Sequence, residues 1–488
     1  MAGRFALETS AFEDAAQHFE KALRFRASAE PAQPAELLGD LGRARRCLGQ
    51  LEPALEAWQE ALQLFESLGQ PRSAATVSLE MARSLVWAGR FEEAVDTAQR
   101  SLSRLDDDAE GRARLLGVSG AAGGLSGRYD PGAGMIDAGL AIAAHVGDDE
   151  LRGHLMIDKA THHFAFMEVA DVAQIGYEAA QLLRSAGALW QLANGLGFLA
   201  ISLVQLGRFK ESAEVDADLE PLAQRIGHHF ALIGFALRAR GQRNFFVSGR
   251  LDALETFARQ DLELCRSTEM PWLTSHSMTW LGLASFWGGD WNAAGERFEE
   301  ATRLEEEAFL HAFDRGFLIL HRTYAGAARD GLAMLDELAA ELPRVGQPNT
   351  WGSWRLLLSA VEALVVAGQN DRAALLYPAV VDSQKTGMVI AVPDGRLVER
   401  VAAIAAAAGR QWETAEEHFL NALRQADELP HRLEQAETRR FYARMLLERD
   451  GPGDRGEAAR LAAEAADLYR RMGMPRHLEL VAGLLNAS

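Results

Sequence analysis

Histidine pairs are the first candidates for chemistry in this sequence, because imidazole is a common metal ligand. His-His-Phe occurs twice, at residues 162–164 and 228–230. Adjacent residues on a helix point about 100° apart, so each pair offers one inward ligand rather than two. His311 and Asp314 are three residues apart and could share one helix face around a metal ion. We expect packed or solvated histidines at helix starts in each case, and we predict no metal site.

Other catalytic signatures are missing from the sequence. It has no G-x-S-x-G motif, and neither Cys47 nor Cys265 stands in a local pattern that activates a thiol. The phosphate-binding pattern G-x-x-x-x-G-K-[ST] is also missing, since the "QKTG" that begins at Gln384 lacks the preceding glycine frame. We therefore expect a protein that is not an enzyme, with no catalytic residue and no cofactor.

Composition excludes several classes of partner. The 488 residues carry a net charge of -19, whereas binding to nucleic acid or to an anionic membrane needs a basic surface. No apolar run approaches the roughly 18 residues that span a bilayer, and the N-terminus lacks a signal-peptide pattern. Two cysteines are too few for a disulfide framework. We expect a cytoplasmic protein with no direct nucleic-acid or membrane partner.

The elements that must position any site come from an internal repeat. A turn glycine, often followed by Arg and an aromatic residue, recurs 37 to 42 residues apart, with one gap of 80. A copy that lacks this glycine is expected near residues 166–173, and further copies are expected from Ser10 and from Asp450. A period near 40 predicts a solenoid of helix pairs. The turn glycines are Gly49, Gly89, Gly127, Gly207, Gly249, Gly289, Gly326, Gly368 and Gly409.

Each repeat has a physical explanation. An amphipathic helix ends at the glycine, which adopts a left-handed conformation at low cost, and a second helix follows. One pair cannot bury its apolar stripe, so neighbouring pairs must stack. We predict an all-α fold, one solenoid over residues 1–488 with roughly 11 to 12 helix pairs. Its repeats form three groups, at 1–150, 151–368 and 369–488. Five residues after the glycine stands a small residue at Ala54, Ala94, Ser212, Ala294 and Ala373.

The repeats resemble the tetratricopeptide (TPR) family, which places a small residue seven positions before the turn glycine. The usual TPR period is about 34, so this is a longer TPR-like variety. HEAT-type repeats share the period near 40 and are the alternative, but they do not predict the Gly-x-aromatic turn. The residues that carry the resemblance are Gly42, Ala82, Gly120, Ala200 and Gly282.

A narrower resemblance covers most of the chain. Residues 400–481 and the start "SAFEDAAQHFEKALRF" look like the C-terminal TPR-like region of bacterial regulators. Those regulators pair an AAA/STAND-type ATPase with a LuxR-type DNA-binding domain or an adenylate/guanylate cyclase domain. The repeats leave no room for such domains here, so the resemblance implies only the sensor or partner-binding part. Because the first repeat starts almost at its turn, we expect end-to-end association there or a missing ATPase-type domain.

Central helices before the turn glycines are enriched in Arg and Trp. In TPR folds this helix lines the concave groove, which the resemblance implies for 188–206, 228–246, 270–288, 310–328 and 349–367. These five helices hold six arginines against two acids, a net of +4, and six of the ten tryptophans. The arginines are Arg238, Arg240, Arg243, Arg315, Arg322 and Arg355.

Spacing and the TPR register select the candidate groove residues. Trp272, His276, Thr279 and Phe286 follow a helical rhythm, and the register adds the others. Such a groove would suit a flat apolar ligand with an anionic group, or a peptide with aromatic and carboxylate groups. We predict a non-catalytic binding or scaffold module; the alternatives are a protein that sequesters a small ligand, and a cryptic enzyme. The candidates are Arg243, Phe246, Trp272, His276, Thr279, Phe286, Phe313, Arg322, Trp351 and Arg355.

Overall fold

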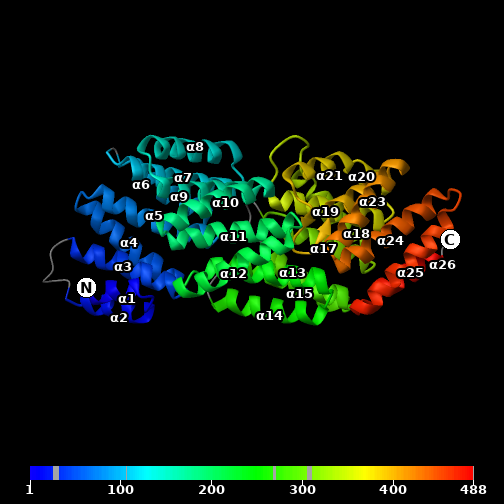
Figure 1. Cartoon of the computed structure of the whole chain (residues 1–488), viewed down its shortest axis with the longest axis horizontal. Coiled ribbons are helices and arrows are strands. Elements are labelled where there is room, and N and C mark those ends of the chain that lie inside the picture. Colours follow the sequence, from blue (N-terminus) through cyan, green and yellow to red (C-terminus); the bar gives the residue numbers. More distant parts are fainter. Residues whose placement is uncertain (26–31, 106, 268–270, 305–309, 487–488) are drawn as a thin grey trace.

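The chain forms successive helices that pack in consecutive pairs, which confirms the predicted all-α class. The structure is a computed structural model that describes residues 1–25, 32–105, 107–267, 271–304 and 310–486. In Figure 1 the N-terminal helices lie at one end and the C-terminal helices at the other. The first twelve helices are α1 (Ala2–Glu8), α2 (Phe12–Leu23), α3 (Gln33–Cys47), α4 (Leu51–Ser67), α5 (Pro71–Trp87), α6 (Phe91–Leu102), α7 (Ala109–Leu125), α8 (Tyr129–Val146), α9 (Asp149–Ala165), α10 (Val169–Ala186), α11 (Leu189–Gln205) and α12 (Phe209–Ile226).

The central repeats contain the helices that were expected to line a groove. One of them begins as a π-helical segment, η2, and continues as α13. The elements are η2 (Ala231–Leu237), α13 (Arg238–Ser248), α14 (Leu251–Ser267), α15 (Pro271–Gly288), α16 (Trp291–Leu304), α17 (Phe313–Tyr324), α18 (Ala328–Glu337), the 3₁₀ turn η3 (Ala339–Glu341) and α19 (Trp351–Val366).

The C-terminal repeats depart from the pattern once. After α19 the outer helix is broken into short pieces, and an antiparallel hairpin follows, with Ile390 opposite Leu397. Strands in this segment were not predicted. The elements are α20 (Asn370–Ala374), α21 (Tyr377–Ser383), the 3₁₀ turn η4 (Gln384–Thr386), β1 (Ile390–Ala391), β2 (Arg396–Leu397), α22 (Val398–Ala408), α23 (Trp412–Glu428), α24 (Arg432–Arg449), α25 (Asp454–Met472) and α26 (Pro475–Asn486).

Turn residues adopt the left-handed conformation that the repeat requires. Eight of the nine predicted turn glycines have φ between 66° and 90°. In the expected copy near residues 166–173 Met167 takes this place with φ of 60°, and in the first and last copies Ser10 and Asp450 do so, with φ of 61° and 50°. The ninth prediction was wrong by one residue. Gly409 has φ of -84°, and Arg410 after it takes the left-handed conformation at 56°.

Small residues let the two helices of a pair approach closely. A Cβ atom on Gly42 would lie 2.4 Å from Trp58 Nε1, and one on Gly282 would lie 2.5 Å from the ring of Phe298. Ala54, Ala94 and Ala294 on the partner helices have no exposed surface. The predicted small positions therefore lie at contacts that a larger side chain would block, which supports the TPR-like assignment.

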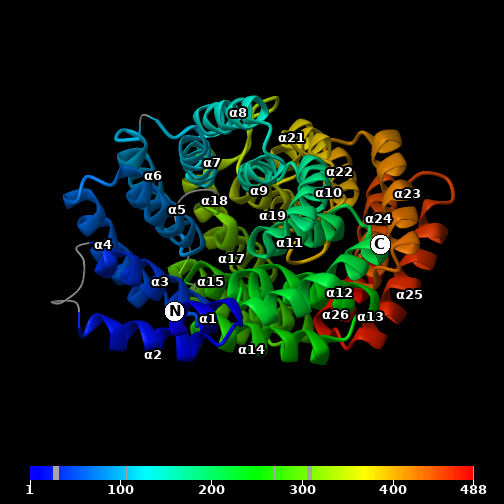
Figure 2. The same cartoon turned by 60° about the vertical axis from the view of Figure 1, so that its left-hand side comes forward.

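The array coils back on itself, so that repeats far apart in the sequence touch. His229 Nε2 donates to the carbonyl of Cys47 at 3.0 Å, and Trp272 Nε1 donates to that of Trp87 at 2.9 Å. The amide of Val389, beside the hairpin, donates to the carbonyl of Gln205 at 3.0 Å. In Figure 2, α15 and α17 lie in the middle of the view, and α4, α6 and α8 lie at its edge. The inner helices therefore pack against other repeats as well as against their neighbours.

No helix among the described ranges has the length and apolar character needed to cross a membrane. The predicted division into three groups of repeats stays a prediction.

Candidate functional site

Nine of the ten predicted groove residues are buried by the protein itself, each with 8% or less of its surface exposed. Arg322 is the exception, with 31% of its side chain exposed. All ten lie on inner helices, as the register required. Their role as ligand contacts stays a prediction. The buried residues are Arg243, Phe246, Trp272, His276, Thr279, Phe286, Phe313, Trp351 and Arg355.

Four of the predicted residues meet around one cavity of about 40 Å³, named here the central cavity. The rings of His276 and Phe313 are 4.7 Å apart between centroids, and those of Phe313 and Trp351 are 5.2 Å apart. Trp272 closes the group, 5.8 Å from His276. Val392 and Pro393 of the hairpin turn line the same cavity. At about 10–15 Å³ per water molecule, this space holds a few waters.

Two unmatched polar atoms line the central cavity. His276 Nδ1 accepts a hydrogen bond from Arg238 at 3.1 Å, and burial lowers the pKa of His276 well below its usual value. The neutral ring therefore carries its proton on Nε2. Neither that N–H nor Oε1 of Gln242 has a hydrogen-bond partner within the described part of the chain. The cavity thus offers one donor and one acceptor between aromatic walls.

Carboxylates elsewhere in the fold neutralise the positive charge counted on the inner helices. Arg243 pairs with Asp216 on α12 at 2.8 Å, and Arg238 pairs with Asp261 on α14 at 2.9 Å. The same holds for Arg240 with Glu220, Arg322 with Glu299, and Arg355 with Asp394. The net of +4 therefore belongs to the five helices in isolation, because carboxylates from outer helices and the hairpin pair with five of the six arginines.

Six predicted residues lie outside the central cavity: the ion-paired Arg243, Arg322 and Arg355, and also Phe246, Thr279 and Phe286. Phe246 stacks on His431 with 4.5 Å between ring centroids. Thr279 Oγ1 donates to Asp314 at 2.5 Å, while burial raises the pKa of Asp314 to about 6. Phe286 lines a second cavity nearer the C-terminus. The structure therefore separates residues that the helical rhythm had placed in one groove.

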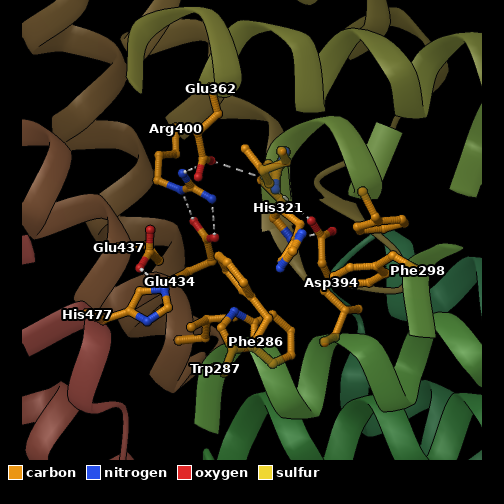
Figure 3. Close-up of a pocket in the computed structure, with 15 residues that line it drawn as sticks. Phe286, Trp287, Phe298, His321, Glu362, Asp394, Arg400, Glu434, Glu437 and His477 are labelled. Carbon is orange, nitrogen blue, oxygen red and sulfur yellow. Dashed lines mark hydrogen bonds and ion pairs between the residues drawn. The ribbon is translucent and has the colours of Figure 1, made fainter. Parts of the chain in front are cut away.

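This second cavity, about 30 Å³ in volume, is surrounded by buried ion pairs and is named here the ion-pair cavity (Figure 3). Arg400 donates to both oxygens of Glu434 at 2.8 Å and to Glu362 at 3.0 Å. Burial acts to raise the pKa of Glu362, but Arg396 and Arg400 outweigh it and lower that pKa. His477 also lines the cavity, and burial lowers its pKa to about 4.

Opposite charges around the ion-pair cavity are equal in number. Four arginines face four acids, and none of those carboxylates has a buried oxygen without a hydrogen-bond partner in the described ranges. Arg355 keeps Nε and Nη1 free of hydrogen bonds, and its guanidinium lies 4.5 Å over the ring of Phe317. The arginines are Arg355, Arg396, Arg400 and Arg440; the acids are Glu362, Asp394, Glu434 and Glu437.

Sequence reasoning missed the hairpin, which supplies Asp394 and Arg396 to this cavity. A signal was present: the apolar run "MVIAV" leads into Pro-Asp-Gly, which is typical of a strand followed by a turn. The regular helical repeat on both sides of this segment favoured helix over strand in the prediction.

The histidine pairs occupy separate places. His163 bonds to Glu168, which also accepts from the hydroxyl of Tyr129 at 3.0 Å. His163, Glu168 and Asp171 together place three possible ligand atoms within 4.8 Å of one another. His311 lies 4.0 Å from Glu341, while Asp314 bonds to Thr279. The cluster at His163 satisfies its own hydrogen bonds, so we assign no metal to it.

Comparison with known proteins shows likeness of fold only. No family model and no curated protein matches the sequence. A Rap protein complexed with competence and sporulation factor matches with a TM-score of 0.48 and 12% identity, over 74% of this chain and 99% of that one. A STAND protein with a tetratricopeptide repeat sensor from Pyrococcus horikoshii gives 0.39 and 10%, over 68% and 52%. Yeast Tom70 gives 0.34 and 17%, over 99% and 93%. The assignment as a TPR-like repeat protein rests on the chain's own helix pairs, turn residues and small residues.

Proposed function

We propose that this chain is a non-catalytic, cytoplasmic binding module, the sensor part of a bacterial signalling regulator. It recognises a peptide, a partner protein or a small ligand with its inner face. One observation carries the proposal: Trp272, His276, Phe313 and Trp351, from the inner helices α15, α17 and α19, surround a cavity with an unmatched donor and acceptor. An aromatic group with an amide or carboxylate provides the complementary chemistry.

Binding at the central cavity requires movement. A cavity of about 40 Å³ admits a few waters but no aromatic side chain, so the hairpin turn at Val392 and Pro393 must withdraw. That turn joins β1 to β2, and β2 leads directly into α22, so its displacement would shift the helix. Because each repeat contacts mainly its neighbours, small rotations add along the array and change its curvature. Ligand binding is thereby converted into a change of overall shape.

Tryptophan fluorescence of the full chain, titrated with peptides that carry aromatic and acidic side chains, tests the proposal. We expect a ligand whose affinity falls at least tenfold in His276→Phe, which keeps a ring at the site but removes the Nε2–H donor. His145→Phe, an exposed substitution on α8, is the matched control and should leave affinity unchanged. Small-angle scattering should change at saturation. Identical scattering curves with and without bound ligand would exclude the change of curvature.

A further inference from the structure

A cleft lies where early and late repeats meet, next to the central cavity, with which it shares Phe230. It has a volume of about 50 Å³ and is named here the seam cleft. One wall comes from the ends of α3 and α5 and the start of α4, and the other from the start of α11 and residues 228–230, just before η2. His229 and Trp272 tie these walls together through the carbonyls of Cys47 and Trp87. The lining residues are Arg46, Gly49, Leu51, Ser84, Trp87, Trp190, His228, His229 and Phe230.

Flat ring systems form most of the lining. Trp87 and Phe230 stack with 4.0 Å between centroids and planes 16° apart. Trp190 and His228 stack at 3.9 Å and 14°, and the guanidinium of Arg46 lies 4.1 Å over Trp190. The first stack joins the two walls directly through Trp87 and Phe230, and the second lies in one wall under Arg46 of the other. A planar guest can extend such a surface by stacking or edge contact.

The unmatched polar atoms of the seam cleft are hydrogen-bond donors. His228 Nδ1 accepts from the amide of Ala231 at 3.3 Å, and burial lowers the pKa of His228 well below its usual value. The neutral ring therefore carries its proton on Nε2, in a side chain that is 1% exposed. That N–H has no partner in the described ranges, and neither does Nε of Arg46, whose Nη1 bonds to Glu80.

An unmatched buried donor costs free energy, so a guest that brings acceptors gains from both of these groups. A carboxylate carries acceptors only, and its hydrogen bonds to guanidinium groups are charge-assisted. No lining residue of this cleft has an unmatched buried acceptor among the residues that the structure describes. The cleft therefore selects for an acceptor group, and its walls select for an aromatic body.

We propose that the seam cleft binds a small planar aromatic carboxylate, for which its two walls must move apart, since about 50 Å³ holds only a few waters. The ring packs against the stacked aromatic walls, and the carboxylate accepts from Arg46 and His228. Because one wall belongs to residues 46–87 and the other to residues 190–230, the bound acid links early repeats to late ones. By contacting both walls, the bound acid stabilises the coiled form of the array. This site is separate from the central cavity, although Phe230 lines both.

The test uses the full chain with indole-3-acetate and benzoate as probes, and their neutral amides as matched ligands. Calorimetric titration should give saturable binding of at least one acid, at least tenfold weaker binding of its amide, and a raised melting temperature with the acid. His228→Phe keeps a ring against Trp190 but removes the donor, and should weaken binding at least tenfold. The exposed His145→Phe should bind as the wild type does.

Three outcomes would overturn the proposal. Folded wild-type protein that binds neither acid has no such site. Equal affinity for acid and amide removes the carboxylate preference, and unchanged affinity in His228→Phe places the ligand elsewhere. His276→Phe separates this site from the proposed sensor site, because it should leave binding of the aromatic acid unchanged while it weakens binding at the central cavity at least tenfold.

Discussion

The seam cleft and the ion-pair cavity are both built where distant repeats meet, but they satisfy their polar groups differently. Around the ion-pair cavity, four arginines and four carboxylates balance, and Arg400 uses three nitrogens on two acids. In the seam cleft, aromatic rings dominate, and two donors remain unmatched in the described chain. Burial is common to both. Unmatched nitrogens also remain around the ion-pair cavity, on Arg355, Arg396, His321 and His477, among the described residues. The seam cleft differs in its aromatic lining without a carboxylate, so that an acceptor on a guest meets no competing acid there.

The largest expected effect comes from breaking the balance in the ion-pair cavity. Arg400→Met leaves Glu434 and Glu362 buried without their main partner, and should lower the free energy of unfolding by about 3–5 kcal/mol. Urea denaturation followed by circular dichroism measures this. Arg460→Met is the control, because its pairs with Glu457 and Glu464 are exposed and should contribute at most about 1 kcal/mol. Equal losses in the two variants would contradict the structural role.

Acid should weaken the same joint through His477. Its pKa is about 4 in the folded chain because of burial, against about 6.5 when unfolded. As pH falls from 6.5 towards 4, the unfolded chain takes up the proton first. This histidine's contribution to stability is therefore full above pH 6.5 and declines by about 1.4 kcal/mol per pH unit below it.

The difference in unfolding free energy between wild type and His477→Gln isolates that contribution, since other titrating groups largely cancel. Between pH 6 and pH 4.5, the free energy of unfolding of the wild type should fall relative to that of the variant. Parallel stability curves over that range would show that His477 titrates alike in both states.

The smallest expected effect is in the seam cleft. His228→Phe preserves the ring stack on Trp190 and removes an unmatched N–H, although it also removes the acceptor for the amide of Ala231. Stability should therefore stay within about 1 kcal/mol of the wild type. Thermal and urea unfolding without ligand check this. A loss above about 2 kcal/mol would mean that the donor is already satisfied, and the contrast between the two regions would fail.

Local chemistry made the repeats predictable. A left-handed turn followed by a close helix contact needs Gly or a tolerated substitute, and small residues at fixed offsets, as at Gly42 and Gly282. The shift from Gly409 to Arg410 shows the limit, since a neighbouring residue can take the same conformation. The helical rhythm likewise placed Trp272 and His276 on one face, and both line the central cavity. It did not reveal that the hairpin turn fills that face.

The sequence by itself determined the helix pairs, their turns and the inner position of the aromatic and arginine residues, because those depend on spacing within about 40 residues. Tertiary structure alone decided which inner surfaces stay open. Arg243 and Arg355 look like free cations on their own helices until Asp216 and Asp394 reach them from other elements. Contacts such as that of His229 with Cys47 depend on rotations summed over several repeats, which no single repeat specifies.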